Sequence, residues 1–322
     1  MRVALAVSQN SDEPLEGLRI ADVPYPEPEP GWTRVKVRAA TLNPHDVWTL
    51  RGVGHPAERI PIVLGCDGAG VTDDGREVII YPVLGDPAQG YGDETLDPAR
   101  SIFSERVDGV LAEYVLVPTA NLVPKPKQLD FAECAALGAA WATAYRMIFT
   151  RGCLQPGSRV LVQGASGGVA GAAIRMAAAA GAHVCATGRT VEKREYALSM
   201  GAHEALEPGR HVPEKVDLVI ETVGEATWSH SMRCVRDGGI IVVAGATTGG
   251  MPPADLQRIF YRQLSIVGSV MATRTEFEQM LRMLDVTGIR PSVDSRISLD
   301  EVVDGYRRMI AGELQGKIVV EF

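Results

Sequence analysis

The chain has 322 residues, enough for two domains, and its content of 46% hydrophobic and 22% charged residues is typical of a folded globular protein. The formal charge is −8 and no basic cluster stands out, so neither nucleic acid nor a membrane surface is an expected partner. Five widely spaced cysteines without a C-x-x-C pair argue against a disulfide framework or a zinc knuckle. The apolar N-terminal run turns polar at Ser8, too early for a signal peptide or a membrane span, so we expect a cytoplasmic protein.

The first part of the chain, up to about Pro126, predicts short antiparallel strands and loops. Runs rich in β-branched residues at 33–40, 77–81 and 112–118 are separated by Pro and Gly. Residues 84–107 form a long, mostly polar insertion that either flanks a site or decorates the surface.

After Pro126 strands alternate with helices, which predicts an α/β domain with a doubly wound, six-stranded parallel sheet over residues 127–270. A helix at 276–285 and a strand at 316–320 follow, and this strand is expected to return to the first domain. Residues 1–126 and 271–322 therefore form the other predicted domain. The predicted strands of the sheet are 158–163, 183–187, 216–220, 239–245 and 264–268, with helices at 167–181 and 191–200.

The most specific motif is a glycine-rich turn between the first strand and the first helix of this sheet. Ala165, Gly167 and Ala170 occupy the three positions of G-x-G-x-x-G/A, so the first glycine is replaced and the third takes its allowed Ala form. Free N–H groups and the positive helix end meet there, which suits a pyrophosphate. The alternative is a tight packing turn without a ligand. The residues assigned to the cofactor in this turn are Gly164, Ala165, Ser166, Gly167, Gly168 and Val169.

The end of the second strand indicates which nicotinamide cofactor binds. An Asp or Glu there would hold the ribose 2′-hydroxyl of NAD, but the sequence has Gly188, Arg189 and Thr190, followed by Lys193. A guanidinium pairs well with a 2′-phosphate, so NADPH is the expected cofactor. The alternative is that the two cations only begin a solvated helix.

Ligands in such sheets lie outside the carboxyl ends of the strands, so other strand ends are expected to complete the cofactor site. Their glycines are equally consistent with ordinary turns. The candidates are Thr222, Val223, Gly245, Ala246, Gly268 and Ser269.

Taken together, several segments resemble the medium-chain dehydrogenase/reductase superfamily, in particular its zinc-independent quinone oxidoreductase-like branch. The resemblance implies a GroES-like antiparallel β catalytic domain built from both chain ends and a Rossmann domain between them. It covers essentially the whole chain. The segments that carry it are 42–46 (LNPHD), 64–71 (LGCDGAGV), 109–117, 143–145 (TAY), 164–169 and 316–319 (GKIV).

Zinc-dependent members of this superfamily bind the metal through two Cys and a His with an adjacent Glu. The matching positions here hold Asn43, Cys66 with Asp67, and Ala139. Zinc needs three protein ligands, so the resemblance implies no metal site. A rearranged site that uses Cys66 and Asp67 near His45 is the alternative.

The resemblance also suggests three catalytic residues. Asn43 would donate a hydrogen bond to the substrate or else cap a short helix, and Thr143 would lie beside the nicotinamide or else only pack. Lys317 would lie at the cofactor or else be an exposed lysine before the last strand. No tyrosine is identified as the proton donor.

The expected function is NADPH-dependent hydride transfer to a quinone or α,β-unsaturated carbonyl compound without zinc, by a homodimer paired along residues 264–270. The alternatives are an alcohol or aldehyde dehydrogenase, with or without zinc, and a low-turnover NADPH-binding protein. The sequence does not identify the physiological substrate.

Overall fold

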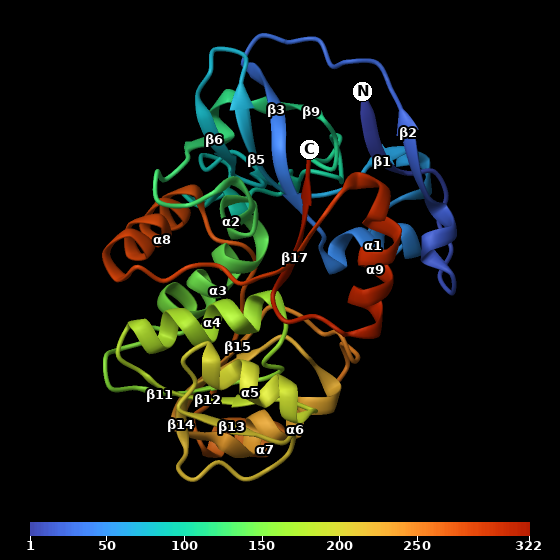
Figure 1. Ribbon diagram of the computed structural model, residues 1–322. Coiled ribbons are helices and arrows are strands. Elements are labelled where there is room, and N and C mark those ends of the chain that lie inside the picture. The colour runs from blue at the N-terminus through green and yellow to red at the C-terminus, as the bar shows by residue number, and fades with distance from the viewer. The chain divides into compact units, whose positions relative to one another are not determined.

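The computed structural model describes residues 1–322 and divides them into two compact units (Figure 1). Unit 1 contains Met1–Ala139, Thr273–Leu281 and Arg290–Phe322, and unit 2 contains Ala140–Ala272 and Arg282–Ile289. The first boundary therefore lies after Ala139, later in the chain than residue 126. The prediction of one β domain and one α/β domain is confirmed.

Unit 1 is built on a seven-stranded sheet with the order β10-β6-β5-β3-β18-β17, with β9 paired to β3. The last strand pairs antiparallel with β3, Val320 opposite Ala40, so the C-terminal strand returns to the sheet of the first domain, as predicted. The inward residues of these strands form one apolar core. The strands are β3 (Trp32–Thr41), β5 (Asp67–Thr72), β6 (Glu77–Ile80), β9 (Tyr114–Pro118), β10 (Leu122–Pro124), β17 (Val293–Ile297) and β18 (Lys317–Glu321).

Smaller elements complete unit 1. The two small sheets are β2-β1-β4 and β7-β8. The helix α8 (Arg274–Thr287) contributes its first part to unit 1 and its last part to unit 2. The other bounds are β1 (Arg2–Ala6), β2 (Leu18–Asp22), β4 (Ile62–Val63), β7 (Val83–Leu84), β8 (Ser101–Ile102), α1 (Pro44–Arg51), α2 (Phe131–Ala135) and α9 (Val302–Ala311).

The insertion at 84–107 is packed into unit 1. Its Phe103 is fully buried, and its Glu94 accepts hydrogen bonds from the Tyr81 hydroxyl (2.9 Å) and the Arg274 backbone N–H (2.6 Å). The insertion is therefore a structural part of this domain, because a buried carboxylate and an aromatic ring tie it to the core.

Unit 2 contains a six-stranded parallel sheet with the order β13-β12-β11-β14-β15-β16. The prediction named five of these strands and missed β13 (Glu204–Leu206), whose three residues are too few to show a pattern. The remaining bounds are β11 (Arg159–Val162), β12 (His183–Thr187), β14 (Val216–Glu221), β15 (Val235–Val243), β16 (Ser265–Gly268), α3 (Ala142–Tyr145), α4 (Gly168–Ala179), α5 (Val191–Ser199), α6 (Glu225–Cys234) and α7 (Leu256–Tyr261).

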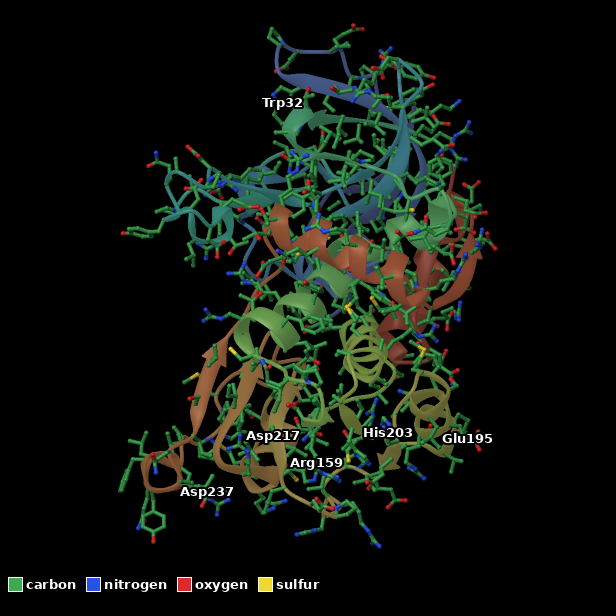
Figure 2. All side chains as sticks on the ribbon, turned by 90° about the vertical axis from the view of Figure 1, so that its left-hand side faces the viewer. Trp32, Arg159, Glu195, His203, Asp217 and Asp237 are labelled. Atoms are coloured by element: carbon green, nitrogen blue, oxygen red, sulfur yellow. The ribbon has the colours of Figure 1, made fainter.

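Because the strands of this sheet are parallel, all of their amino ends lie along one edge and all of their carboxyl ends along the other. Arg159, Asp217 and Asp237 mark the amino edge in Figure 2, where the Arg159 N–H donates to the Asp217 carboxylate (2.7 Å).

No helix of the protein is long and apolar enough to span a bilayer.

Candidate functional site

The glycine-rich turn lies at the carboxyl edge of unit 2, between β11 and α4. Gly164 has a φ of +77°, and a Cβ there would lie 3.1 Å from Val223, so both its conformation and its surroundings favour glycine. Its N–H donates to the Thr187 hydroxyl (3.1 Å), and the Ala165 N–H donates to the Thr187 carbonyl (2.7 Å). The turn is therefore tied to the end of the neighbouring strand β12.

The helix α4 begins at this turn without a side-chain cap. Gly167 is its N-cap, and the first intrahelical bond runs from the Gly171 N–H to the Gly167 carbonyl (2.8 Å). Helix geometry leaves the N–H groups of the first turn, Gly168 to Ala170, without ladder partners. These donors and the helix dipole form a site that suits a pyrophosphate.

At the end of β12 two cations lie close together. Arg189 is exposed, and Thr190 caps α5 by accepting a hydrogen bond from the Lys193 N–H (3.3 Å). Partial burial and the nearby positive charge of Arg189 lower the pKa of Lys193. The residues that directly follow β12, Gly188 to Thr190, include no carboxylate, and the nearest one, Glu192, is hydrogen-bonded to the Thr190 side chain. Two like charges held together there favour an anion with a high charge, such as a phosphate.

A buried chain of hydrogen bonds inside unit 2 supports the glycine-rich turn. The Thr187 hydroxyl donates to the Gln163 side-chain oxygen (2.8 Å), and the Gln163 amide donates to the Ser231 hydroxyl (3.0 Å). Ser231 in turn donates to Glu221 (2.6 Å). The ends of β11, β12 and β14 are thereby joined to α6.

The fully buried Glu221 carboxylate also shapes the turn after β14. It accepts hydrogen bonds from the N–H groups of Val223 (2.8 Å) and Gly224 (3.1 Å) and from the Thr227 hydroxyl (2.9 Å). Sequence reasoning missed Gln163, Glu221 and Ser231 as supporting residues. For Gln163 and Glu221 the available signal was a polar residue at the end of an otherwise apolar strand.

The other predicted strand ends lie along the same carboxyl edge. A Cβ on Gly245 would lie 2.9 Å from the Thr222 carbonyl oxygen, so this glycine allows the turns after β14 and β15 to approach closely. Nothing lies within 4 Å of a Cβ built on Gly268. Val223 accepts a bond from the Thr248 N–H (2.8 Å), and Ser269 donates its N–H to Val243 (2.8 Å). Ala246 follows Gly245 in the turn after β15.

Unit 1 contains a buried polar centre formed by Asn43, Asp67 and Lys317. The Lys317 ammonium donates to the Asn43 side-chain oxygen (2.6 Å) and the Leu42 carbonyl (2.9 Å), and it lies 3.5 Å from Asp67. The Asn43 amide donates to Asp67 (2.9 Å), which also accepts from Thr41 (2.9 Å). Lys317 is 6% exposed, so the interpretation as an exposed lysine is wrong.

Asn43 is also the N-cap residue of α1, and its backbone N–H takes part in the cap. Its N–H donates to the Asp46 carboxylate (2.8 Å), and Asp46 accepts a second bond from the Gly65 N–H (2.9 Å). The Asn43 side chain is thus directed to Asp67 and Lys317, and its amide has further, weaker acceptors in the Thr41 carbonyl (3.4 Å), the Thr41 hydroxyl (3.5 Å) and the Cys66 sulfur (3.5 Å). The second amide proton of Asn43 is therefore weakly engaged.

The residues of this centre do not fit a zinc ion. The Ala139 side chain has no ligand atom, and its N–H donates to Asp67 (2.6 Å). Burial and the adjacent Asp67 raise the pKa of the Cys66 thiol well above its usual value. The positive charge beside Asp67 is supplied by the Lys317 ammonium.

His45 pairs with Glu105 across 3.2 Å. Burial lowers the pKa of His45, but the hydrogen bond with Glu105 and the charges of Asp46, Glu105 and Asp67 outweigh it, so the pKa lies above its ordinary value. The third predicted catalytic residue, Thr143, is buried in α3 of unit 2 and 8% exposed.

Comparison with known proteins agrees with this architecture. Residues 29–127 match the alcohol dehydrogenase GroES-like domain, and residues 168–285 match the zinc-binding dehydrogenase domain. The chain is 29% identical to quinone oxidoreductase of Homo sapiens (93% of this chain, 92% of the relative). It is 30% identical to acryloyl-coenzyme A reductase of Metallosphaera sedula (95% and 96%).

Among solved structures, an NAD-dependent alcohol dehydrogenase superposes over the whole of both chains with a TM-score of 0.92 and 34% identity. The chain belongs to the medium-chain dehydrogenase/reductase superfamily. It is an oxidoreductase of the kind that uses a pyridine nucleotide.

Proposed function

We propose that the protein transfers hydride from NADPH to a quinone or another α,β-unsaturated carbonyl compound without a zinc ion in the buried centre of unit 1. The observation that carries this proposal is that centre, where the Lys317 ammonium lies between Asn43 and Asp67. A reductase that lacks a metal must polarise its substrate through hydrogen bonds, and this centre contains a partly engaged amide donor.

The cofactor residues follow from the carboxyl edge of unit 2. The first-turn N–H groups of α4 hold the pyrophosphate, and Arg189 and Lys193 hold the 2′-phosphate. Thr222, Val223, Gly245, Ala246, Gly268 and Ser269 complete the same edge. When bound, the reduced nicotinamide supplies the hydride.

The preference for NADPH rests on charge. An NAD-dependent alcohol dehydrogenase is among the similar structures, so the fold itself is compatible with either cofactor. In this chain Arg189 and Lys193 follow β12, and no carboxylate stands among Gly188 to Thr190, directly after the strand, which favours the phosphorylated cofactor.

Asn43 is the proposed donor to the substrate carbonyl. When hydride reaches the β-carbon of a conjugated carbonyl compound, negative charge develops on the carbonyl oxygen. Lys317 donates to the Asn43 side-chain oxygen and so polarises its amide, which makes the second N–H a stronger donor. Lys317 thus acts on the substrate through Asn43, and Thr143 is proposed to contact the nicotinamide.

A steady-state screen tests the function. NADPH oxidation is measured with quinones, enones, aldehydes and crotonyl-CoA, with NADH in parallel. We expect turnover with quinones or conjugated carbonyl compounds, a higher kcat/KM with NADPH, and a large loss of kcat in Asn43→Ala. Turnover with simple aldehydes alone would support the alcohol dehydrogenase alternative. Tight NADPH binding without turnover of any of these compounds would support the low-turnover alternative.

A further inference from the structure

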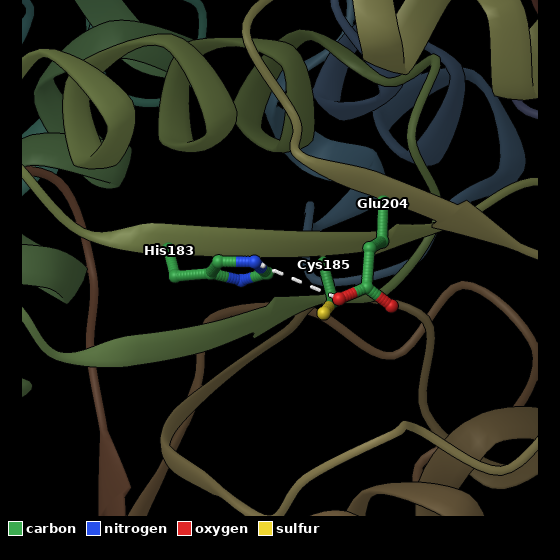
Figure 3. A group of neighbouring side chains, drawn as sticks. All are labelled: His183, Cys185 and Glu204. Atoms are coloured by element: carbon green, nitrogen blue, oxygen red, sulfur yellow. Dashed lines mark ion pairs between the residues drawn. The ribbon is translucent and has the colours of Figure 1, made fainter.

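We propose that His183, Cys185 and Glu204, at the amino side of the sheet in unit 2, bind one zinc ion. His183 and Cys185 are two residues apart on β12, so their side chains leave the same face of the strand. Glu204 on β13 pairs directly with Cys185. One potential ligand atom from each side chain lies within 4.8 Å of the others. Figure 3 shows the three side chains together.

The distances suit shared coordination. The His183 Nε2 atom lies 3.6 Å from a Glu204 oxygen. Two ligands of a tetrahedral zinc ion, each bound at ~2.0–2.1 Å, lie ~3.4 Å apart. A small adjustment of side chains therefore brings a nitrogen, a sulfur and an oxygen onto one ion. All three residues belong to paired strands, which hold a site more firmly than loops do.

The proposed zinc site is open to solvent on one side and closed by the protein on the other. Cys185 is fully buried, whereas the side chains of His183 and Glu204 are 34% and 27% exposed. The His183 ring stacks on His203 with centroids 4.6 Å apart, and the His203 Nδ1 accepts a bond from the Val184 N–H (3.1 Å). The imidazole is thus oriented from the protein side, while water can complete the coordination from the solvent side.

The chemical types of the three ligand atoms indicate which metal ion the site would bind. An imidazole nitrogen, a thiolate sulfur and one carboxylate oxygen form a borderline-soft set that suits zinc and does not suit magnesium or calcium. Burial raises the pKa of the Cys185 thiol to about 11, so zinc must displace its proton, which leaves to solvent as the zinc–sulfur bond forms.

Arg159 is the competing cation. It begins β11 opposite His183, and its guanidinium lies 3.7 Å from Glu204 and 3.6 Å from Glu214. Without metal it neutralises Glu204, and with metal it can keep Glu214 as its partner. The site lies away from the carboxyl edge that carries the cofactor residues, so the ion would tie β12 to β13 without touching the cofactor. The inference does not depend on the proposed function.

The test uses the whole protein after treatment with a chelator, titrated with Co²⁺ and separately with Zn²⁺. We expect one metal ion per chain and a thiolate-to-cobalt charge-transfer band in the near ultraviolet. Cys185→Ser should abolish the band, and Glu204→Gln should weaken binding at least ~10-fold through the loss of a charged ligand. Cys234→Ser, which changes another buried cysteine of the same core, should leave the band unchanged.

Arg159→Gln distinguishes a metal site from a simple ion-pair network. Removal of the competing positive charge should tighten metal binding ~5-fold. The proposal is overturned if the wild-type protein gives no band, or if the band persists in Cys185→Ser. A band lost in Cys66→Ser instead would place the metal in unit 1 and would count against the proposed zinc-free function as well.

Discussion

Two cations at the end of β12 carry the proposed preference between NADPH and NADH. Arg189→Glu should raise the Kd for NADPH at least ~10-fold and leave that for NADH nearly unchanged, because a charge-assisted pair worth ~1.5–3 kcal/mol is lost. Fluorescence titration with both cofactors measures this. Arg282→Glu, an equal charge change at an exposed position of α8, is the control. Equal weakening of both cofactors in Arg189→Glu would contradict the assignment.

The buried pair of Lys317 and Asp67 should dominate the stability of the polar centre. Lys317→Met leaves an uncompensated carboxylate in the core and should lower the free energy of unfolding by ~3–5 kcal/mol. The double variant Lys317→Met/Asp67→Asn removes both charges and should recover a large part of that loss. Urea unfolding of the two variants measures the difference. A double variant as unstable as the single one would show that the two charges do not depend on each other.

His45 and Glu105 should make part of the stability depend on pH. The pKa of His45 is higher in the folded protein than its ordinary value of 6.5, so the pair contributes fully below that value. The contribution is lost as the pH rises through the folded pKa and the imidazole becomes neutral. A double-mutant cycle of His45→Gln and Glu105→Gln should give a coupling of ~0.5–1 kcal/mol at pH ~5.5 and almost none at pH ~8.5. Equal coupling at both pH values would refute the ionic origin.

At the scale of elements, the turn after β14 depends on one carboxylate. Glu221→Gln retains one acceptor oxygen for the N–H groups of Val223 and Gly224 and replaces the other with a donor that faces the Ser231 hydroxyl. We expect a loss of ~1.5–3 kcal/mol in stability and a higher KM for NADPH, because this turn also lies against Gly164. Thermal unfolding and steady-state kinetics check both. An unchanged KM with reduced stability would limit Glu221 to a structural role.

Some helices and strands could be predicted from a pattern in the sequence alone, and others could not. The strands β11, β12, β14 and β16 and the helix α4 have long apolar or alanine-rich runs between turn signals, and all were predicted. The strand β13 has only three residues, and it exists because its backbone can pair with β12. The segment at 84–107 reads as a polar loop, since the contacts that bury Phe103 and Glu94 come from distant parts of the chain.

For the whole molecule, the exposed edge of the unit 2 sheet is where the homodimer predicted from the sequence would pair. The edge strand β16 exposes Ile266, and α7 beside it in sequence exposes Phe260 and Tyr261. An unpaired apolar edge favours pairing with a second copy. Light scattering after gel filtration should give about twice the chain mass of 34.5 kDa, and Ile266→Lys should shift the protein to monomer.

Val286→Lys is the control for that experiment, because it changes a residue that is 85% exposed on α8, away from the edge strand. It should leave the dimer intact. A wild-type protein that elutes and scatters as a monomer would contradict the pairing.

The sequence by itself determined the two-domain class, the parallel sheet and the position of the glycine-rich turn, because each follows from local periodicity and turn chemistry. It also placed Arg189 and Lys193 at the end of β12, since they follow directly after that strand. Only the tertiary structure showed that Lys317 and Asn43 meet over Asp67, and that His183, Cys185 and Glu204 share one face of a sheet. These groups are separated in sequence, and they meet only because strand pairing brings distant segments into register.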